Sequence, residues 1–299
     1  MGKTPKQPYY YPESAKDDIS DDYFGTEVPD PYRWLEDDMS EETTEWVKAQ
    51  NKVTFNYLKE IPFRDSLKDR MTEIWNYPKM GIPSKEGHYF VYNYNTGLQN
   101  QDILYFKKDL HEEGRVLLDP NTFSEDGTAS LSAFRVSNNS KYVAYGISRG
   151  GSDWNELYIK EIESGKIYND QLKWVKFSGI AWYKEGFFYT KYKEPKKGDE
   201  LKGENKHASV YYHRVGTPQS KDLLIRKDDA HPERGFHMEV TDDERFMLLY
   251  VTESTSGNSL AFQKSELGSS GFTWLADGFV SDYHVIGNDN NMLFILTNL

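Results

Sequence analysis

The chain of 299 residues contains no cysteine. A disulfide framework, a thiolate zinc site and a cysteine nucleophile are therefore excluded. Long hydrophobic runs are missing as well: no stretch approaches the roughly 18 apolar residues of a membrane-spanning helix, and the first residues lack the apolar core of a signal peptide. We therefore expect no membrane partner, and a cytoplasmic location, or a periplasmic one if a signal peptide was removed.

Positive charge is scarce. Lys and Arg number 36 against 48 Asp and Glu, which gives a net charge of −12. A surplus of negative charge repels phosphate backbones and anionic lipids, and the sequence has no basic arm or stripe. Nucleic acid is therefore not expected as a partner.

Aromatic residues are abundant. They make up 15% of the chain and include 22 tyrosines. Aromatic side chains favour strands, so the composition favours a mainly β fold. The length suits one large repetitive domain or two ordinary ones, because domains commonly span about 100 to 200 residues.

Residues 1–75 differ from the rest and are predicted to form an N-terminal arm followed by a helix pair. The polar, proline-containing start predicts an extended arm up to Asp22. A helix is predicted over residues 40–61, with acidic residues in its first turn, and a second over residues 63–74, ending before Pro78.

The stretch "DPYRWLED", residues 30–37, is predicted to begin a short helical turn. Asp30 is suited to the N-cap and Pro31 to the first helical position. The apolar residues of the stretch are predicted to anchor the start of the chain, and its charged residues to pair or remain solvated. The predicted anchors are Tyr32, Trp34 and Leu35, and the charged residues are Arg33, Glu36 and Asp37.

Residues 76–299 show a long repeat of strand patterns. A polar turn followed by an aromatic or apolar strand recurs at positions 83, 137, 183, 241 and 287, with spacings of 54, 46, 58 and 46 residues. Each blade of a β-propeller spans roughly 40 to 50 residues. Serial hairpins of a β-sandwich repeat about every 8 to 12 residues and lack this longer period.

Further strand patterns complete the repeat. Third strands are predicted at "NELYIKEIE", "ASVYYHRV" and "SLAFQKSE", and fourth strands at "GRVLLD", "DLLIRK" and "FTWLAD". Four units are therefore complete, and the fifth stops within its second strand. The predicted fold is mainly β, an incomplete propeller of about four and a half blades over residues 76–299, preceded by the helical segment 1–75.

Groups for catalysis are not found. No serine is predicted to occupy the strand-to-helix elbow that exposes the nucleophile of α/β-hydrolases. The seven histidines form neither H-E-x-x-H nor an i, i+4 pair, and the carboxylates cluster in turns. We therefore expect no catalytic residue, no metal site and no cofactor within this chain, which by itself has the features of a binding or gating module.

Several motifs together resemble the prolyl oligopeptidase family. They are "DPYRWLED", then "WVKAQNKVTFNYL", and later "GSDW" and "VKFSGIAW" within the propeller. The resemblance implies a seven-bladed propeller that covers an α/β-hydrolase domain, on which the N-terminal segment packs. It also implies a serine endopeptidase that hydrolyses short proline-containing peptides on the C-terminal side of proline. The Ser, Asp and His of that activity would lie beyond residue 299, in the hydrolase domain of the same polypeptide, so the chain alone is expected to be inactive.

The resemblance implies two substrate-binding residues. Phe177 matches a phenylalanine that lines an apolar subsite, although an apolar residue in a strand is more often part of the core. Asp153 matches an aspartate near the interdomain cavity that can pair with an arginine of the hydrolase domain, although it also suits a turn before Trp154. Thr252 stands where the family often has a basic residue.

Two other hypotheses for the function remain open. A propeller without a hydrolase domain could bind peptides or proteins and have no catalytic activity. A five-bladed glycoside hydrolase would need ring closure within the chain, and the ending "FILTNL" disfavours it.

Overall fold

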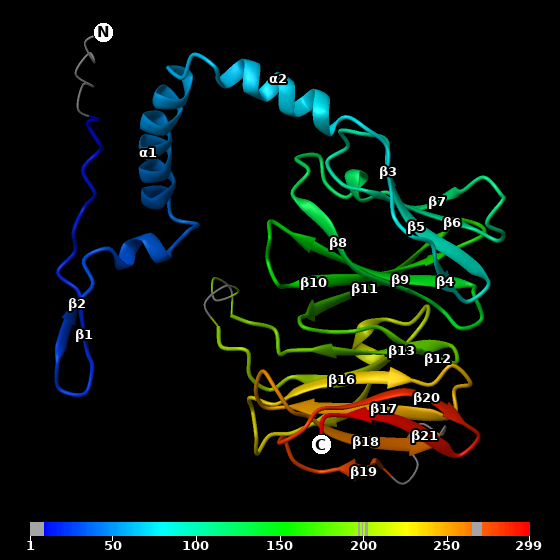
Figure 1. Cartoon of the computed structure of the whole chain (residues 1–299). Helices are drawn as coiled ribbons and strands as arrows, with labels where there is room; N and C mark the ends of the chain where they lie inside the picture. Colours follow the sequence, from blue (N-terminus) through cyan, green and yellow to red (C-terminus); the bar gives the residue numbers. More distant parts are fainter. Residues whose placement is uncertain (1–8, 197, 199, 201–202, 265–270) are drawn as a thin grey trace. The chain divides into compact units, whose positions relative to one another are not determined.

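The computed structural model describes residues 9–196, 198, 200, 203–264 and 271–299. The chain divides into two compact units, Met1–Asn76 and Tyr77–Leu299. Figure 1 shows the first unit as two helices with an extended arm and the second as a series of antiparallel sheets.

The first unit contains the two predicted helices. Ser40 caps α1, because its Oγ accepts a hydrogen bond from the backbone N–H of Thr43 at 3.1 Å. Glu41 and Glu42 lie in the first turn of α1, where their negative charges interact favourably with the positive end of the helix dipole. A β-hairpin within the arm was not predicted. The elements are β1 (Ser20–Asp22), β2 (Glu27–Pro29), η1 (Arg33–Glu36), α1 (Glu41–Lys59) and α2 (Arg64–Trp75).

The arm lies along α1. The indole N–H of Trp46 donates to Ser14 Oγ at 2.8 Å, and Gln50 Nε2 donates to the carbonyl of Pro12 at 3.3 Å. Trp34 adds a third link, because its indole N–H donates to the carbonyl of Ala15 at 3.0 Å. The prediction that the tryptophan motif anchors the start of the chain is therefore confirmed for Trp34.

The other residues of the motif divide between anchoring and solvation. Arg33 pairs with Asp21 and Asp30, which ties η1 to the hairpin. Leu35 is half-buried, whereas Tyr32 is exposed, so the prediction that Tyr32 is an anchor is wrong. The predicted N-cap is also displaced: η1 begins at Arg33, and the cap position falls at Tyr32 rather than Asp30.

The second unit is an incomplete β-propeller, as predicted. Successive strands pair antiparallel in four groups of four, the blades, and a single backbone pair, Val175 with Lys191, joins the second and third groups into one eight-stranded sheet. The first sheet, here blade 1, also pairs β3 (Lys79–Met80) with its second strand. The strands of blade 1 are β4 (Ser84–Glu86), β5 (Tyr89–Asn95), β6 (Ile103–Lys107) and β7 (Arg115–Leu118).

The next blades follow the same order. Blade 2 consists of β8 (Ala129–Val136), β9 (Tyr142–Arg149), β10 (Asn155–Glu161) and β11 (Ile167–Val175). Blade 3 consists of β12 (Ala181–Tyr183), β13 (Gly186–Lys191), β14 (Ser209–Arg214) and β15 (Leu223–Lys227). Blade 4 consists of β16 (Gly235–Val240), β17 (Phe246–Thr252), β18 (Ser259–Lys264) and β19 (Thr273–Ala276). A fifth sheet pairs β20 (Tyr283–Asp289) with β21 (Met292–Thr297), and the short helices η2 (Pro120–Thr122) and η3 (Gln219–Lys221) lie in connections.

A backbone feature repeats in all five sheets. The turn between the first and second strand contains one residue with left-handed backbone, with φ between 49° and 60°. These residues are Gly87, Ser140, Lys184, Glu244 and Asn290. The same turn geometry thus closes the first hairpin of every blade, which is the structural basis of the repeat seen in the sequence.

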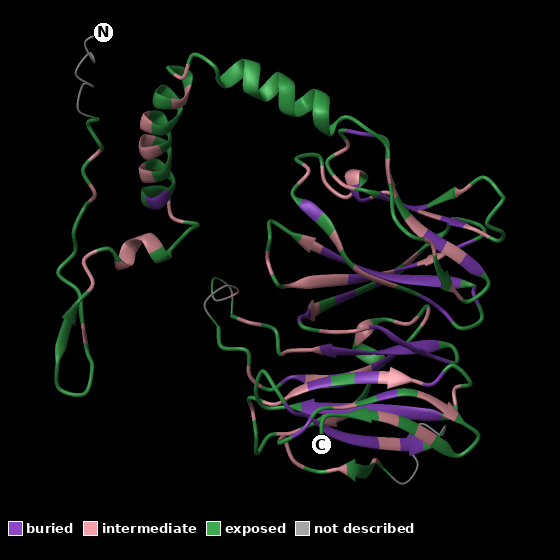
Figure 2. Ribbon diagram, in the orientation of Figure 1, coloured by how far each residue is buried: buried purple, intermediate pink, exposed green. Residues whose placement is uncertain are grey.

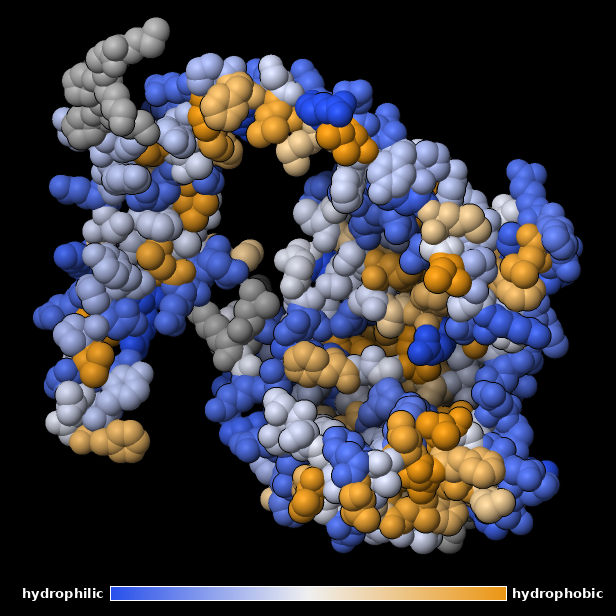
Figure 3. Space-filling view, viewed as in Figure 1, coloured by the Kyte–Doolittle hydropathy of each residue, from blue (hydrophilic) through white to orange (hydrophobic). Residues whose placement is uncertain are grey.

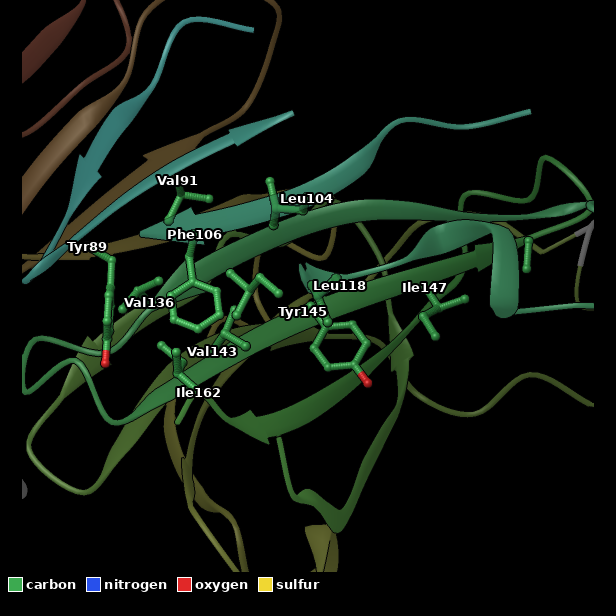
Figure 4. Packing of buried hydrophobic residues seen from close by; sticks show 12 residues of the cluster. Tyr89, Val91, Leu104, Phe106, Leu118, Val136, Val143, Tyr145, Ile147 and Ile162 are labelled. Atoms are coloured by element: carbon green, nitrogen blue, oxygen red, sulfur yellow. The ribbon is translucent and has the colours of Figure 1, made fainter. Parts of the chain in front are cut away.

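The core lies between successive blades. One buried cluster joins strands β5, β6 and β7 of blade 1 to β8 and β9 of blade 2, and Figure 4 shows Val91, Leu104 and Phe106 facing Val143 and Tyr145. Similar clusters lie between blades 2 and 3, blades 3 and 4, and blade 4 and the fifth sheet. Figure 2 shows these buried residues along the strands, whereas α2 is exposed throughout. Face-to-face burial of aromatic and aliphatic side chains therefore stabilises the stack of sheets.

Candidate substrate-binding site

The connection between blades 2 and 3 has an unusual backbone. Trp174 and Phe177 both adopt left-handed conformations, with φ of 61° and 51°. Two hydrogen bonds hold the segment at its ends. At one end the N–H of Tyr192, the residue after β13, donates to the carbonyl of Trp174 at 2.9 Å. At the other end the N–H of Thr190, within β13, donates to Ser178 Oγ at 2.8 Å. Bulky residues rarely adopt this conformation, and such strain persists where the surrounding structure fixes it.

Phe177 projects from this segment toward solvent. Its relative exposure is 60%, so it is not a blade core residue. An exposed aromatic ring on a fixed backbone can provide apolar contact area for a ligand.

Asp153 lies in the turn before β10, and its side chain is 64% exposed. Asp153 lies close to the segment that carries Phe177, and Lys176 connects the two. Lys176 was not among the predicted site residues. Lys176 Nζ lies 3.7 Å from Asp153 Oδ2 and 5.3 Å from the centre of the Phe177 ring. The two predicted site residues therefore share one neighbour, and the motif "VKFSGIAW" already contained it.

A group of aromatic side chains packs next to Lys176. The Trp154 ring lies 5.0 Å from Lys176 Nζ and packs edge-on against Trp174 at 5.6 Å and Tyr192 at 6.2 Å. The indole N–H of Trp154 donates to the carbonyl of Glu200 at 2.7 Å. Burial raises the pKa of Tyr192, so this phenol remains neutral near pH 7.

A cavity of about 1070 Å³ lies beside the site. Its lining comes chiefly from the first strands β8, β12 and β16 together with the turn after β4, which is the position of a propeller's central channel. Gly179 and Ile180, which follow Phe177, contribute to the lining, whereas Phe177 and Asp153 lie outside it. The candidate site is therefore next to the channel and not within it.

A second cavity of about 340 Å³ lies between blade 4 and the fifth sheet. Thr252, which stands where the family often has a basic residue, forms part of its lining. Here Tyr250 Oη donates to Glu239 Oε2 at 2.9 Å. The hydrogen bond from His237 lowers the pKa of Glu239 despite its burial, and Tyr250 adds to that effect. Within the described residues, no group of three or more His, Asp or Glu side chains is arranged to hold a metal ion.

One serine has the letters of a nucleophile motif. The prediction that no serine lies on an elbow overlooked the G-x-S-x-G pattern at residues 146–150. Ser148 lies within strand β9, its Oγ donates to the carbonyl of Ser152 at 2.6 Å, and the chain continues through a turn into β10. A nucleophile elbow needs a strand followed by a helix, so Ser148 lacks that setting.

None of the described helices is long and apolar enough to cross a membrane. The fold and the site together define the class of protein: a β-propeller with an exposed aromatic and acidic site beside its channel and no elbow serine among the described residues. A sequence model described as the N-terminal β-propeller domain of prolyl oligopeptidase matches residues 12–299. The chain belongs to the prolyl oligopeptidase family, as the motifs indicated.

Individual relatives agree with this assignment. The chain is 44% identical over 289 residues to prolyl endopeptidase from Elizabethkingia meningoseptica, and the match covers 96% of this chain and 41% of the relative. It is 37% identical to prolyl oligopeptidase A from Amanita bisporigera, with coverage of 100% and 44%. A solved structure of prolyl oligopeptidase B from Galerina marginata, bound to a 35mer hydrolysis and macrocyclization substrate, superposes with a TM-score of 0.84 at 29% identity. That match covers 99% of this chain and 45% of the other, so this chain spans less than half the length of its relatives.

Proposed function

We propose that this chain forms the propeller portion of a serine peptidase that hydrolyses short peptides on the C-terminal side of proline. The propeller would limit access to a Ser, Asp and His triad beyond residue 299. The observation that carries the proposal is the solvent-exposed Phe177, which shares its neighbour Lys176 with Asp153, in a chain that matches prolyl endopeptidases over nearly its whole length. These residues can bind a substrate but cannot activate a nucleophile.

Phe177 is proposed to line an apolar subsite for the substrate. Fully burying a Phe side chain stabilises by roughly 1.5 to 3 kcal/mol, and the exposed part of Phe177 leaves much of this available for binding. Asp153 is proposed to pair with an arginine of the hydrolase domain. Its partly exposed carboxylate is suited to this because Lys176, at 3.7 Å, lies beyond direct hydrogen-bond distance.

The N-terminal segment 1–75 is proposed to pack on the hydrolase domain of the same polypeptide. The two helices keep large apolar side chains exposed, which Figure 3 shows as orange patches on otherwise blue helices. These side chains are Val47, Phe55, Leu67, Met71 and Ile74. Contiguous exposed apolar residues at helical spacing indicate an unfilled docking surface.

The proposed location is the cytoplasm, or the periplasm if a signal peptide is removed. The alternative function is a propeller that binds peptides or proteins without catalysis. The two are distinguished by the reading frame that contains these residues: a glycine-flanked serine followed by Asp and His supports the peptidase, and their absence supports the binding module.

The experiment compares the polypeptide of that reading frame with residues 1–299 alone. The former is expected to hydrolyse a Gly-Pro chromogenic substrate, and the latter neither to hydrolyse it nor to react with a fluorophosphonate probe. Phe177→Ala is expected to raise KM about tenfold, because the lost contact is worth roughly 1.4 kcal/mol. Leu110→Ala, at an exposed apolar residue of the loop between β6 and β7, serves as the control. Labelling of residues 1–299, or no hydrolysis by the longer polypeptide, would overturn the proposal.

A further inference from the structure

Lys176 is a buried cation at the candidate site. Its side chain is only 11% exposed, and the carboxylate found near it, Asp153, lies 3.7 Å away. Burying an ammonium group is unfavourable unless other groups replace its hydration. The rings of Trp154 and Phe177 do so here, because both lie within the roughly 6 Å over which an aromatic face attracts a cation.

The segment around Phe177 is held by hydrogen bonds from the N–H of Thr190 to Ser178 Oγ and from the N–H of Tyr192 to the carbonyl of Trp174, but those bonds do not orient the Phe177 ring. Among the residues that the structure describes, the cation–π contact found for the Phe177 ring is with the ammonium group of Lys176. The same ammonium group is the cation next to Asp153. One side chain thus contacts both residues that are proposed to meet the substrate and its hydrolase domain.

We propose that Lys176 is a positioning residue of the substrate-binding site. It holds the Phe177 ring and the Asp153 carboxylate in one arrangement, while the Trp154 ring provides a second aromatic contact for its ammonium group. This inference rests on the proposed function and adds to it a residue that touches no substrate itself. Its specific consequence is that Lys176 matters most for substrates with an apolar group long enough to reach Phe177.

The test uses the whole polypeptide that contains this chain, with Lys176→Met, Lys176→Arg and Lys191→Met. Methionine keeps the length and apolar character of the stem and removes the charge, whereas arginine keeps the charge. Lys191, on β13, is the matched control, because its Nζ also makes an aromatic contact, at 4.5 Å from the ring of Tyr211 on β14.

Two chromogenic substrates separate positioning from general damage: benzyloxycarbonyl-Gly-Pro-p-nitroanilide, with a terminal ring, and acetyl-Gly-Pro-p-nitroanilide, without one. Lys176→Met is expected to raise KM for the first about five- to tenfold, in line with the strength of a desolvated cation–π contact. We expect kcat to change less than about twofold and KM for the second substrate to stay within about twofold. Lys176→Arg should restore most of the loss, and Lys191→Met should have no effect.

A second measurement does not depend on activity. The indole N–H resonance of Trp154 in a ¹H–¹⁵N spectrum should shift in Lys176→Met and stay in place in Lys191→Met. If neither substrate is hydrolysed by the unaltered polypeptide but the indole shifts, the proposed function fails and the packing of Lys176 is supported. Equal KM changes for both substrates, or an unshifted indole, would overturn the positioning role.

Discussion

His213 and Asp222 form a buried ion pair at the junction of blades 2 and 3. His213 Nδ1 lies 2.7 Å from Asp222 Oδ1, and on the other side of the ring His213 Nε2 lies 2.9 Å from Asp170 Oδ1. The histidine side chain is fully buried, at 0% exposure. Because carboxylates only accept, both ring nitrogens must donate, so the ring is an imidazolium. Asp222 also accepts from Tyr189 Oη, and Asp170 from the N–H of Gly216.

The group links two blades that share little backbone pairing. Asp170 belongs to β11 of blade 2 and His213 to β14 of blade 3, whereas the backbone pairing between those blades is the single pair of Val175 with Lys191. Burial alone would lower the pKa of His213, but hydrogen bonds and charges from Asp222 and Asp170 outweigh it and raise the pKa above 6.5. The protonated histidine therefore stabilises the junction.

Stability should decrease as the pH rises. A histidine whose pKa is raised on folding stabilises fully below the unfolded value of 6.5 and loses this contribution as the pH rises through the folded value. The free energy of unfolding, measured in urea from pH 6 to 9, should fall across that window. The slope should disappear in His213→Gln, and an identical slope in this variant would contradict the assignment.

Removing the imidazolium should be strongly destabilising. His213→Gln leaves two buried carboxylates without their cation, and breaking a buried ion pair in this way costs about 3 to 5 kcal/mol. Urea unfolding at pH 6 measures the loss. His111→Gln, at an exposed histidine, should change stability by less than about 0.5 kcal/mol. A similar small change for His213→Gln would argue against a charged ring.

The repeat and α1 could be predicted from sequence because local chemistry determines them. Each first hairpin has a polar turn, and Ser40 before two glutamates specifies the start of α1. The Asp170 and His213 contact could not be predicted, because the polar residues of a strand look like a solvated face until the next blade covers them. For the same reason the polar strand β11 was not predicted from the sequence. The third and fourth strands that were predicted are all present in the structure.

The candidate site was predictable in part. Family motifs pointed to Phe177 and Asp153, but no periodicity distinguishes an exposed Phe177 from a core residue, because the left-handed backbone turns the side chain. The role of Lys176 also depends on bringing together the start of β10 and the end of β11. Only the register of that hairpin, which ends on Asn155 paired with Val175, places Asp153 and Lys176 side by side.

An ion cluster between blades 1 and 2 should give stability that is lost in acid. Glu163 binds Lys108 at 2.8 Å and Arg115 at 2.9 Å, and accepts a hydrogen bond from Tyr89 at 2.9 Å. These contacts, that from Lys108 foremost, lower its pKa to about 2. A lowered carboxylate pKa stabilises above the ordinary value of 4.5, and that contribution is lost as the pH falls toward 2.

Solvent limits the size of this effect, because Glu163 is about half exposed. We expect Glu163→Gln to cost about 1 kcal/mol or less at pH 7 in low salt, and less still at high salt. Urea unfolding at two salt concentrations measures both. Glu125→Gln, at an exposed glutamate, should change nothing, and a salt-independent loss in Glu163→Gln would exclude an electrostatic origin.

Gly186 should not tolerate a side chain. A Cβ at this position would lie 2.0 Å from the carbonyl oxygen of His213, which belongs to the paired backbone of β14 and cannot rotate away. Gly186→Ala is therefore expected to destabilise by at least about 1 to 3 kcal/mol in thermal or urea unfolding. Gly81→Ala is the control, because its Cβ would meet its nearest atom at 3.5 Å. Equal stability of the two variants would show that β13 and β14 can separate locally.

Trp34 should hold the arm on α1. Its indole N–H bonds Ala15, and its ring packs edge-on against Trp46 with centres 6.3 Å apart. Trp34→Ala removes both contacts, worth together about 1 to 3 kcal/mol locally. Amides of residues 13–17 should then exchange with deuterium at least about fivefold faster, while those of blade strands keep their rates. Tyr32→Ala, which removes an exposed ring of the same motif, should leave the arm protected. Unchanged exchange in Trp34→Ala would mean that the bonds from Trp46 and Gln50 suffice to hold the arm.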